Sequence, residues 1–239
     1  MTRNNKSQMP NKLASKVQIL GVGVSSTTCT EVLAKIEKER LFIVTVNPEF
    51  VMLAQDDPEF KNILNSADLA IPDGVGLRFA RPGLVIVPGR KLVEEIIKTK
   101  KYKIFYLGGQ SGVAEAMAKK YNGFFDSGHE NIKSQITNSQ INSQIIKKIN
   151  DYKPDILLVA YGAPYQEKWI WNNKNVLKTR VCIGVGGTFD YLTGRSAIPP
   201  KIIEKLGLEW LWRLILQPWR WKRQLNLVRF IIAIFKPSF

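Results

Sequence analysis

The feature that most constrains the fold is a regular alternation of short apolar segments with helical patterns between residues 17 and 200. The apolar segments are rich in β-branched residues, which favours strands. Strands that alternate with helices at short spacing indicate a parallel, multiply wound sheet. We therefore expect a Rossmann-like α/β domain over residues 17–200. Its predicted strands are Val17–Val24, Leu41–Val46, Leu69–Ile71, Tyr102–Leu107, Asp155–Ala160 and Arg180–Val185.

Helix-start signals support this alternation. Asn47-Pro48 and Asp57-Pro58 each put a capping side chain directly before a proline suited to a first helical turn. They predict helices that end near Asp56 and Ser66, and further helices are expected from about Glu31 to Glu39 and over Val113–Tyr121. Residues 131–150, rich in Asn, Ser, Gln, Ile and Lys, are expected to form a weakly constrained helix or insert.

Small and polar residues gather at the predicted strand ends. Ligands of such sheets bind in the crevice at the carboxyl ends of the strands, so these positions are expected to converge on one pocket. They are Thr45 to Asn47, Asp73, Gly108-Gly109, Tyr161-Gly162 and Gly186-Gly187.

Two of these positions suggest chemistry. Gly108-Gly109, between a strand and a helix, has the arrangement in which free N–H groups bind phosphate, although a tight turn explains it equally well. Asp73 is the best candidate for a general base, with ordinary Pro-Asp-Gly turn chemistry as the alternative. The dinucleotide fingerprint is absent, because Ser26 stands where Gly21-Val22-Gly23 needs its third glycine.

Four further polar residues have both a structural and a functional interpretation. Asn47 is explained as a helix cap and Thr45 as a strand residue, yet both could donate hydrogen bonds to a sugar. Gln166 fits a solvated helix start or a ligand contact, and Asp190 fits a helix cap or an acceptor for a nucleoside.

The charge of the chain indicates its kind of partner, and its cysteine and histidine content bears on metal binding. The chain has 35 Lys and Arg against 20 Asp and Glu, a net charge of +15, which favours nucleic acid, acidic lipid or phosphorylated substrates. Cys29, Cys182 and the single His129 are too scattered for a His/Cys metal centre.

The two ends of the chain differ. Residues 1–16 are expected to be a disordered basic lead without a signal peptide, and no run of 18 apolar residues predicts a membrane-spanning helix, so a cytoplasmic location is expected. Residues 201–239 hold eight Lys and Arg, two Glu and four of the six Trp, with Pro218 interrupting any single helix. We interpret this segment as an appendage for the membrane interface; a core-packing terminal helix and nucleic-acid binding are the alternatives.

Several blocks together resemble the WecG/TagA/CpsF glycosyltransferases, over roughly residues 17–235. The blocks are Thr45 to Glu49, Asp68 to Gly76, Gly162 to Trp169, Gly184 to Asp190, and Leu206 to Trp210 followed by Arg213, Pro218, Arg220 and Arg223.

This resemblance implies an inverting, metal-independent transfer of an N-acetylhexosamine from a UDP-sugar to undecaprenyl-diphosphate-linked GlcNAc. The donor would carry N-acetylmannosamine or its uronic acid, and the product would feed wall teichoic acid or surface polysaccharide. By position, Asp73 resembles the base, Thr45 and Asn47 match sugar contacts, Gln166 lies near the diphosphate and Asp190 near the nucleoside. Arg213, Arg220 and Arg223 match arginines that close over the site at the membrane.

One segment departs from the family pattern E-R-x-x-G-x-D-L. The corresponding residues run from Val85 to Leu92, and Ile86 stands where the family has the arginine thought to assist the diphosphate. Arg90 or Lys91 is expected to supply that charge instead.

The absence of any Asp-x-Asp triplet agrees with a reaction that needs no metal and no cofactor besides the donor, with Arg, Lys and helix ends neutralising the diphosphate. The rival hypotheses are a non-catalytic UDP-sugar-binding protein and a basic nucleic-acid-binding protein; we expect no nucleic-acid partner.

Overall fold

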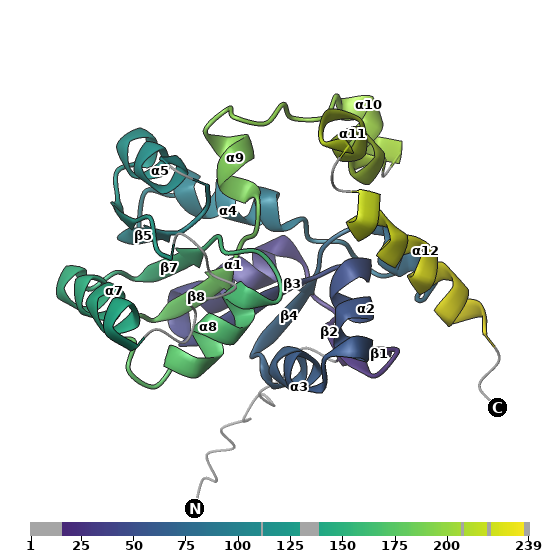
Figure 1. The fold of residues 1–239 in the computed structure, drawn as a ribbon, viewed down its shortest axis with the longest axis horizontal. Coiled ribbons are helices and arrows are strands. Elements are labelled where there is room, and N and C mark those ends of the chain that lie inside the picture. The colour runs from purple at the N-terminus through teal and green to yellow at the C-terminus, as the bar shows by residue number, and fades with distance from the viewer. Residues whose placement is uncertain (1–15, 111, 130–138, 207, 219–220, 237–239) are drawn as a thin grey trace, which may run out of the picture.

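A computed structural model describes residues 16–110, 112–129, 139–206, 208–218 and 221–236. Its centre is a six-stranded sheet in which every neighbouring pair is parallel, in the order β4-β3-β8-β7-β5-β6 (Figure 1). The predicted parallel α/β architecture is thereby confirmed. The strands are β3 (Leu41–Val46), β4 (Leu69–Pro72), β5 (Ile104–Leu107), β6 (Phe124–Asp126), β7 (Ile156–Val159) and β8 (Val181–Gly184).

Successive strand residues point to opposite sides of the sheet. Both sides are apolar here, and helices cover each of them. Phe42, Val44 and Val46 of β3 lie in one apolar cluster, whereas Leu41 and Ile43 lie in the other. The first cluster includes side chains of α2 (Pro48–Asp56), α3 (Pro58–Ser66), α7 (Ser139–Tyr152) and α8 (Tyr165–Asn173). The second includes α1 (Cys29–Lys38), α4 (Gly89–Lys98), α5 (Val113–Tyr121) and α9 (Thr188–Leu192).

The predicted capping devices are confirmed. The Asn47 side-chain oxygen accepts the Phe50 N–H at 3.0 Å, and the Asp57 oxygen accepts the Phe60 N–H at 2.9 Å. Thr28 and Glu31 form a capping box at the start of α1. These bonds satisfy N–H groups that a helix start leaves without a partner, and they set α2 to begin immediately after β3.

One predicted strand is wrong. Val17–Val24 is an antiparallel hairpin of β1 (Lys16–Ile19) and β2 (Val22–Ser25), separate from the central sheet. The chain reverses at Leu20 and Gly21, whose φ angles of 49° and 76° are both positive. Leucine is an unusual first residue for such a turn, which is why the sequence pattern conceals it.

The structure adds elements that were not predicted. A 3₁₀ helix, η1 (Val75–Phe79), and α4 follow β4, and β6 extends the sheet beyond β5. α4 begins beside Asp73, the candidate general base. Residues 1–15 of the predicted lead, residues 1–16, lie outside the described residues, and Lys16 begins β1. Of the predicted helix or insert over residues 131–150, residues 131–138 also lie outside them, whereas residues 139–150 are helical in α7.

The C-terminal segment is helical and is interrupted near Pro218, as predicted, forming α10 (Lys201–Leu206), α11 (Glu209–Leu216) and α12 (Trp221–Phe235). α12 packs along α2, and its Phe230 is fully buried in the first apolar cluster. Arg229 Nη1 donates to Asp56 Oδ2 at 2.8 Å, and Arg229 Nη2 donates to Asp56 Oδ1 at 2.9 Å. None of the helices in the described ranges combines the length and apolar character needed to cross a membrane.

Candidate active site

The strand order brings the predicted site residues to one edge of the sheet. Read across the sheet, the carboxyl ends lead to Asp73 after β4, Asn47 after β3, Gly186-Gly187 after β8, Tyr161-Gly162 after β7 and Gly108-Gly109 after β5. β4 stands at one end of this row, with β3, β8 and β7 between it and β5. This edge is where doubly wound sheets bind ligands.

Asp73 is held at the start of α4. Its backbone N–H continues the sheet by donating to the Val46 carbonyl at 2.7 Å, and its Oδ1 accepts the Gly89 N–H at 3.2 Å. The carboxyl is partly exposed, and the positive end of a helix favours a negative charge beside it. An oriented, partly exposed carboxylate at this edge has the placement that a general base requires.

Thr45 lies against the same helix start. Its hydroxyl donates to the Gly184 carbonyl at 3.3 Å, and the residue is almost buried. A Cβ added at Gly89 would lie only 2.9 Å from Thr45 Cγ2 and 3.5 Å from Asp73 Oδ2. Glycine at position 89 therefore lets α4 approach closely enough for Thr45, Asp73 and Gly89 to form one cluster.

Asn47 adjoins this cluster through Gly74, which follows Asp73. A Cβ at Gly74 would lie 3.8 Å from the Asn47 Cβ. Because the Asn47 oxygen caps α2, its amide nitrogen is the part of the side chain left to donate to a ligand.

Gln166 links the turns after β7 and β8. Its Oε1 accepts the backbone N–H of Gly162 at 3.1 Å and that of Gly186 at 2.9 Å. The residue is only 1% exposed, so the solvated helix start considered from the sequence does not occur. The two turns are instead tied together by a buried side-chain amide.

Glu167 was missed by the sequence reasoning. It is fully buried, and its Oε1 accepts a hydrogen bond from Gln166 Nε2 at 2.6 Å. Burial raises the pKa of its carboxyl to about 7, against the opposing effect of the Gln166 hydrogen bond. The sequence held one usable signal: Trp169 and Ile170 follow at helical spacing, which puts Gln166 and Glu167 on the face of α8 that meets the sheet.

The far end of the row is built around Tyr161. Gly108 donates its N–H to the Asp126 carbonyl at 2.9 Å, so this N–H is not free for phosphate as the sequence suggested. A Cβ at Gly108 would lie 2.6 Å from the Tyr161 ring. Gly109 is exposed. Burial raises the pKa of the Tyr161 hydroxyl far above its usual range, so this residue contributes a neutral ring surface.

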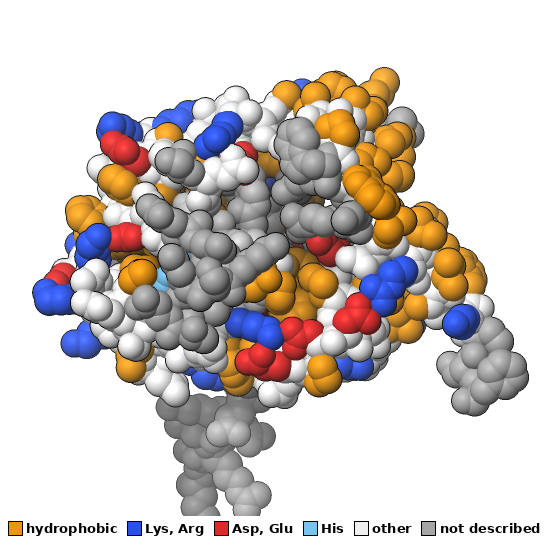
Figure 2. Space-filling model, in the orientation of Figure 1, with side chains coloured by type: hydrophobic (Ala, Val, Ile, Leu, Met, Phe, Trp, Pro, Cys, Tyr) orange, Lys and Arg blue, Asp and Glu red, His pale blue; other side chains and the backbone are white. Residues whose placement is uncertain are grey.

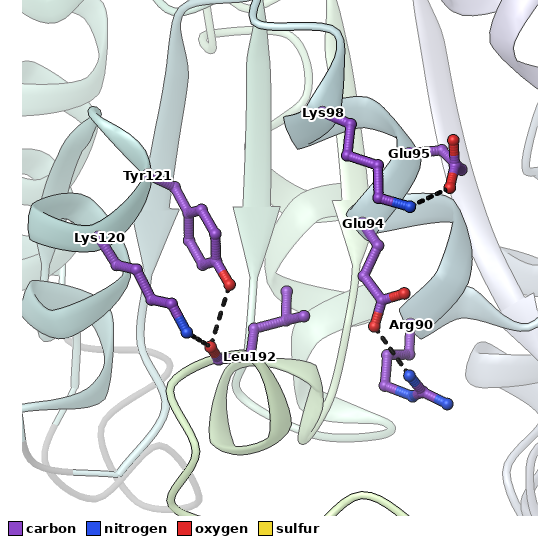
Figure 3. Close-up of polar contacts among 7 residues, drawn as sticks. All are labelled: Arg90, Glu94, Glu95, Lys98, Lys120, Tyr121 and Leu192. Atoms are coloured by element: carbon purple, nitrogen blue, oxygen red, sulfur yellow. Dashed lines mark hydrogen bonds and ion pairs between the residues drawn. The ribbon is translucent and has the colours of Figure 1, made fainter. Parts of the chain in front are cut away.

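α9 completes the edge on the α4 and α5 side. Gly187 precedes its first residue, and Asp190 lies in its first turn, partly exposed. The end of α9 is fixed because Lys120 and Tyr121 of α5 both donate to the Leu192 carbonyl, at 2.7 and 3.1 Å (Figure 3).

Arg90 is the second residue of α4, directly after Gly89. Its Nη1 lies 2.8 Å from Glu94 Oε1, one helical turn further along, and its side chain is only 12% exposed (Figure 3). Ile86, at the family's arginine position, is partly buried and packs against the first apolar cluster. Arg90 therefore directly follows the residue that donates to Asp73, while its guanidinium pairs with Glu94; whether it contacts the substrate stays a prediction.

The appendage arginines are not placed. Arg220 lies outside the described residues, as do the side chains of Arg213 and Arg223. Within the described part of the chain, no group of three or more His, Cys, Asp or Glu is arranged to hold a metal ion.

The fold and the site together define a class of protein. It is the class of doubly wound α/β enzymes, which bind ligands at the carboxyl edge of a parallel sheet. Here that edge carries a carboxylate at a helix start, buried polar side chains and glycine turns. Within this class, residues 17–239 match the model of the glycosyl transferase WecG/TagA/CpsF family. The chain belongs to this family of glycosyltransferases.

Similar proteins agree with this assignment. A relative from Bacillus subtilis (strain 168), named N-acetylglucosaminyldiphosphoundecaprenol N-acetyl-beta-D-mannosaminyltransferase, is 33% identical over 205 residues, covering 81% of this chain and 78% of the relative. A relative of the same name from Staphylococcus aureus (strain MRSA252) is 31% identical over 242 residues, covering 93% and 92%.

Proposed function

We propose that this glycosyltransferase moves N-acetylmannosamine, or the corresponding uronic acid, from UDP to undecaprenyl-diphosphate-linked GlcNAc, in teichoic acid or surface polysaccharide synthesis. The names of the relatives support the acceptor and the mannosamine unit. The observation that carries the proposal is the cluster of Thr45, Asp73 and Gly89 at the carboxyl edge of the sheet.

In the proposed reaction, the Asp73 carboxylate takes the proton from the acceptor hydroxyl. The hydroxyl oxygen forms a bond to the anomeric carbon on the face opposite UDP, the bond from that carbon to the diphosphate oxygen breaks, and UDP leaves with the electron pair. Attack from the opposite face inverts the anomeric configuration. Thr45 and the Asn47 amide nitrogen are proposed to hold the sugar.

The strand order favours a particular direction for UDP. Asp73 and Gly108 follow strands four positions apart, which at about 4.8 Å for each step is roughly 19 Å. Since the diphosphate is bonded directly to the anomeric carbon, we place it nearer Gly186-Gly187, which lie between these ends. Gly108-Gly109, Tyr161 and Asp190 would then serve the nucleoside end.

We propose that no metal ion assists departure of UDP. The supporting features are the absence of an Asp-x-Asp triplet, the helix starts at this edge, the placement of Arg90 and the net charge of +15. Arg213, Arg220 and Arg223 are proposed to add positive charge from the appendage.

We further propose that α10 to α12 attach the enzyme to an anionic membrane surface at the inner face of the cell membrane. α12 has two apolar faces: Phe230 faces the core, whereas an exposed stripe repeats at helical spacing through Trp221, Leu225, Val228, Ile232 and Phe235. Figure 2 shows hydrophobic side chains gathered over α11 and α12. Exposed apolar side chains beside basic residues are typical of helices that lie in a membrane interface.

A donor and acceptor assay tests the proposal. UDP release is measured with UDP-ManNAc, UDP-ManNAcA and UDP-GlcNAc, each with and without lipid-linked GlcNAc, and again in excess EDTA. We expect acceptor-dependent UDP release with a mannosamine donor, unchanged by EDTA, and a product of inverted anomeric configuration. UDP binding without any turnover would instead indicate a non-catalytic binding protein.

A further inference from the structure

The turns after β7 and β8 are connected by one side chain. Gln166 Oε1 accepts a backbone N–H from each turn, from Gly162 and from Gly186. β7 and β8 are neighbours near the middle of the sheet, so these turns lie at the centre of the ligand-binding edge. The last backbone bond between the two strand ends runs from the Val185 N–H to the Val159 carbonyl at 2.9 Å, and the Gln166 amide bridges the turns just beyond it.

This link works in only one orientation of the amide. An amide rotated by 180° would present its NH₂ group to the two N–H donors, and donors cannot satisfy one another. Glu167 favours the same orientation from the other side of the amide, because its Oε1 accepts from Gln166 Nε2 at 2.6 Å. Both side chains are buried, so water is not there to stabilise the alternative.

The backbone of β8 makes room for this pair. A Cβ at Gly184 would lie 2.5 Å from Glu167 Oε1 and 2.7 Å from Gln166 Nε2. Among the described residues, Glu167 Oε2 has no hydrogen-bond partner. Burying a carboxyl in a helix face that packs on a sheet is unfavourable. The hydrogen bond from Gln166 to Glu167 Oε1 is the polar contact that offsets this cost.

We propose that Glu167 is a positioning residue for donor binding. It keeps the Gln166 oxygen toward Gly162 and Gly186, and so fixes the two turns against which the diphosphate and nucleoside of the donor lie. This inference rests on the proposed donor site. It assigns Glu167 no contact with substrate.

The test compares Glu167→Leu, which removes the acceptor, with Glu167→Gln, whose amide oxygen can still accept from Gln166. Glu115→Gln, which replaces an exposed carboxylate on α5, is the control.

In Glu167→Leu we expect hydrogen exchange at the Gly162 and Gly186 amides to accelerate about tenfold or more, as for a lost buried hydrogen bond. UDP affinity by calorimetry should fall and donor KM should rise, with a smaller change in kcat. Glu167→Gln and Glu115→Gln should match the unmodified protein. Should Glu167→Leu not fold, Glu167→Met is measured with the same expectations.

Gln166→Leu and the double variant show whether Glu167 acts through Gln166. We expect Glu167→Leu to have little further effect on UDP affinity when Gln166 is already replaced. Effects that multiply in the double variant, or unchanged amide exchange and UDP affinity in Glu167→Leu, would overturn the inference. Failure of the unmodified protein to bind UDP would refute the proposed donor instead, and the amide exchange would still decide the role of Glu167.

Discussion

The carboxyl edge of the sheet and the C-terminal helices distribute their side chains in opposite ways. At the sheet edge, polar groups such as Thr45, Gln166 and Glu167 are buried and bonded to one another or to the backbone. On α12, apolar side chains such as Val228 and Ile232 face outward. The first region is shaped by contacts within the chain, whereas the second offers a surface that favours contact with an apolar environment.

α12 connects the two regions. Phe230 inserts into the core, and α12 packs along α2, the helix that Asn47 caps next to Asp73. A Cβ at Gly76 would lie 3.4 Å from Leu227 of α12 and 2.8 Å from Pro48. The outward stripe of α12 is thus held in a fixed relation to the proposed base, while chemistry, attachment and packing depend on different side chains.

The largest effect is expected for Asp73→Asn. The amide oxygen can still accept the Gly89 N–H, but it cannot take a proton at neutral pH, so turnover should fall about 10²- to 10⁴-fold. UDP affinity by calorimetry should stay close to that of the unmodified protein. Asp151→Asn, on the exposed face of α7, is the control. Full turnover in Asp73→Asn would remove Asp73 from the role of base.

Val228→Glu with Ile232→Glu should separate attachment from chemistry. Each change removes an apolar contact with the bilayer and adds a negative charge, so binding to anionic vesicles should weaken about tenfold or more. UDP affinity should be unchanged because the substituted side chains point away from the core. Val176→Glu is the matched control, since Val176 and Val228 are both 54% exposed. Cosedimentation with vesicles that is equal in all three proteins would contradict the membrane surface.

The pH dependence of stability should identify the buried carboxyl. The pKa of Glu167 is raised to about 7 from an ordinary 4.5, so the native state keeps a proton that the unfolded chain releases. The contribution is complete below about pH 4.5 and is lost as the pH rises through 7, by at most about 1.4 kcal/mol for each pH unit. The amide in Glu167→Gln cannot titrate. The melting temperature of this variant should therefore rise relative to that of the unmodified protein between pH 5 and pH 8. Identical pH profiles would show that Glu167 is not buried as described.

The smallest effect is expected at the ion pair of α12 with α2. Arg229 and Asp56 are both about half exposed, so a double-mutant cycle with Arg229→Gln and Asp56→Asn should give a coupling of only about 0.2–1 kcal/mol in urea unfolding. A much larger coupling would mean that the ion pair, rather than burial of Phe230, holds α12 in place.

Local signals predicted the parts of the fold that local physics determines. Asn47-Pro48 and Asp57-Pro58 start α2 and α3 as expected, and Leu41–Val46 is β3 as predicted. Tertiary packing determines the rest. A glutamate near the start of a helix, such as Glu167, is expected to be exposed, but the approach of α8 to Gly184 buries it. The start of α4 likewise depends on the fit of Gly89 against Thr45. No short-range pattern encodes such contacts between distant segments.

The position of β8 has a consequence for biosynthesis. β8 is the last strand to leave the ribosome, yet it lies between β3 and β7, and it carries Gly186-Gly187 at its end. Until it inserts, β3 and β7 each present an unpaired edge, and the nascent domain consists of two separate half-sheets. Pairing a late strand with partners made much earlier is a slow, non-local step. We therefore expect the ligand-binding edge to become complete only when this final strand pairs with both β3 and β7, and misassembly to begin at the unpaired edges of those two strands.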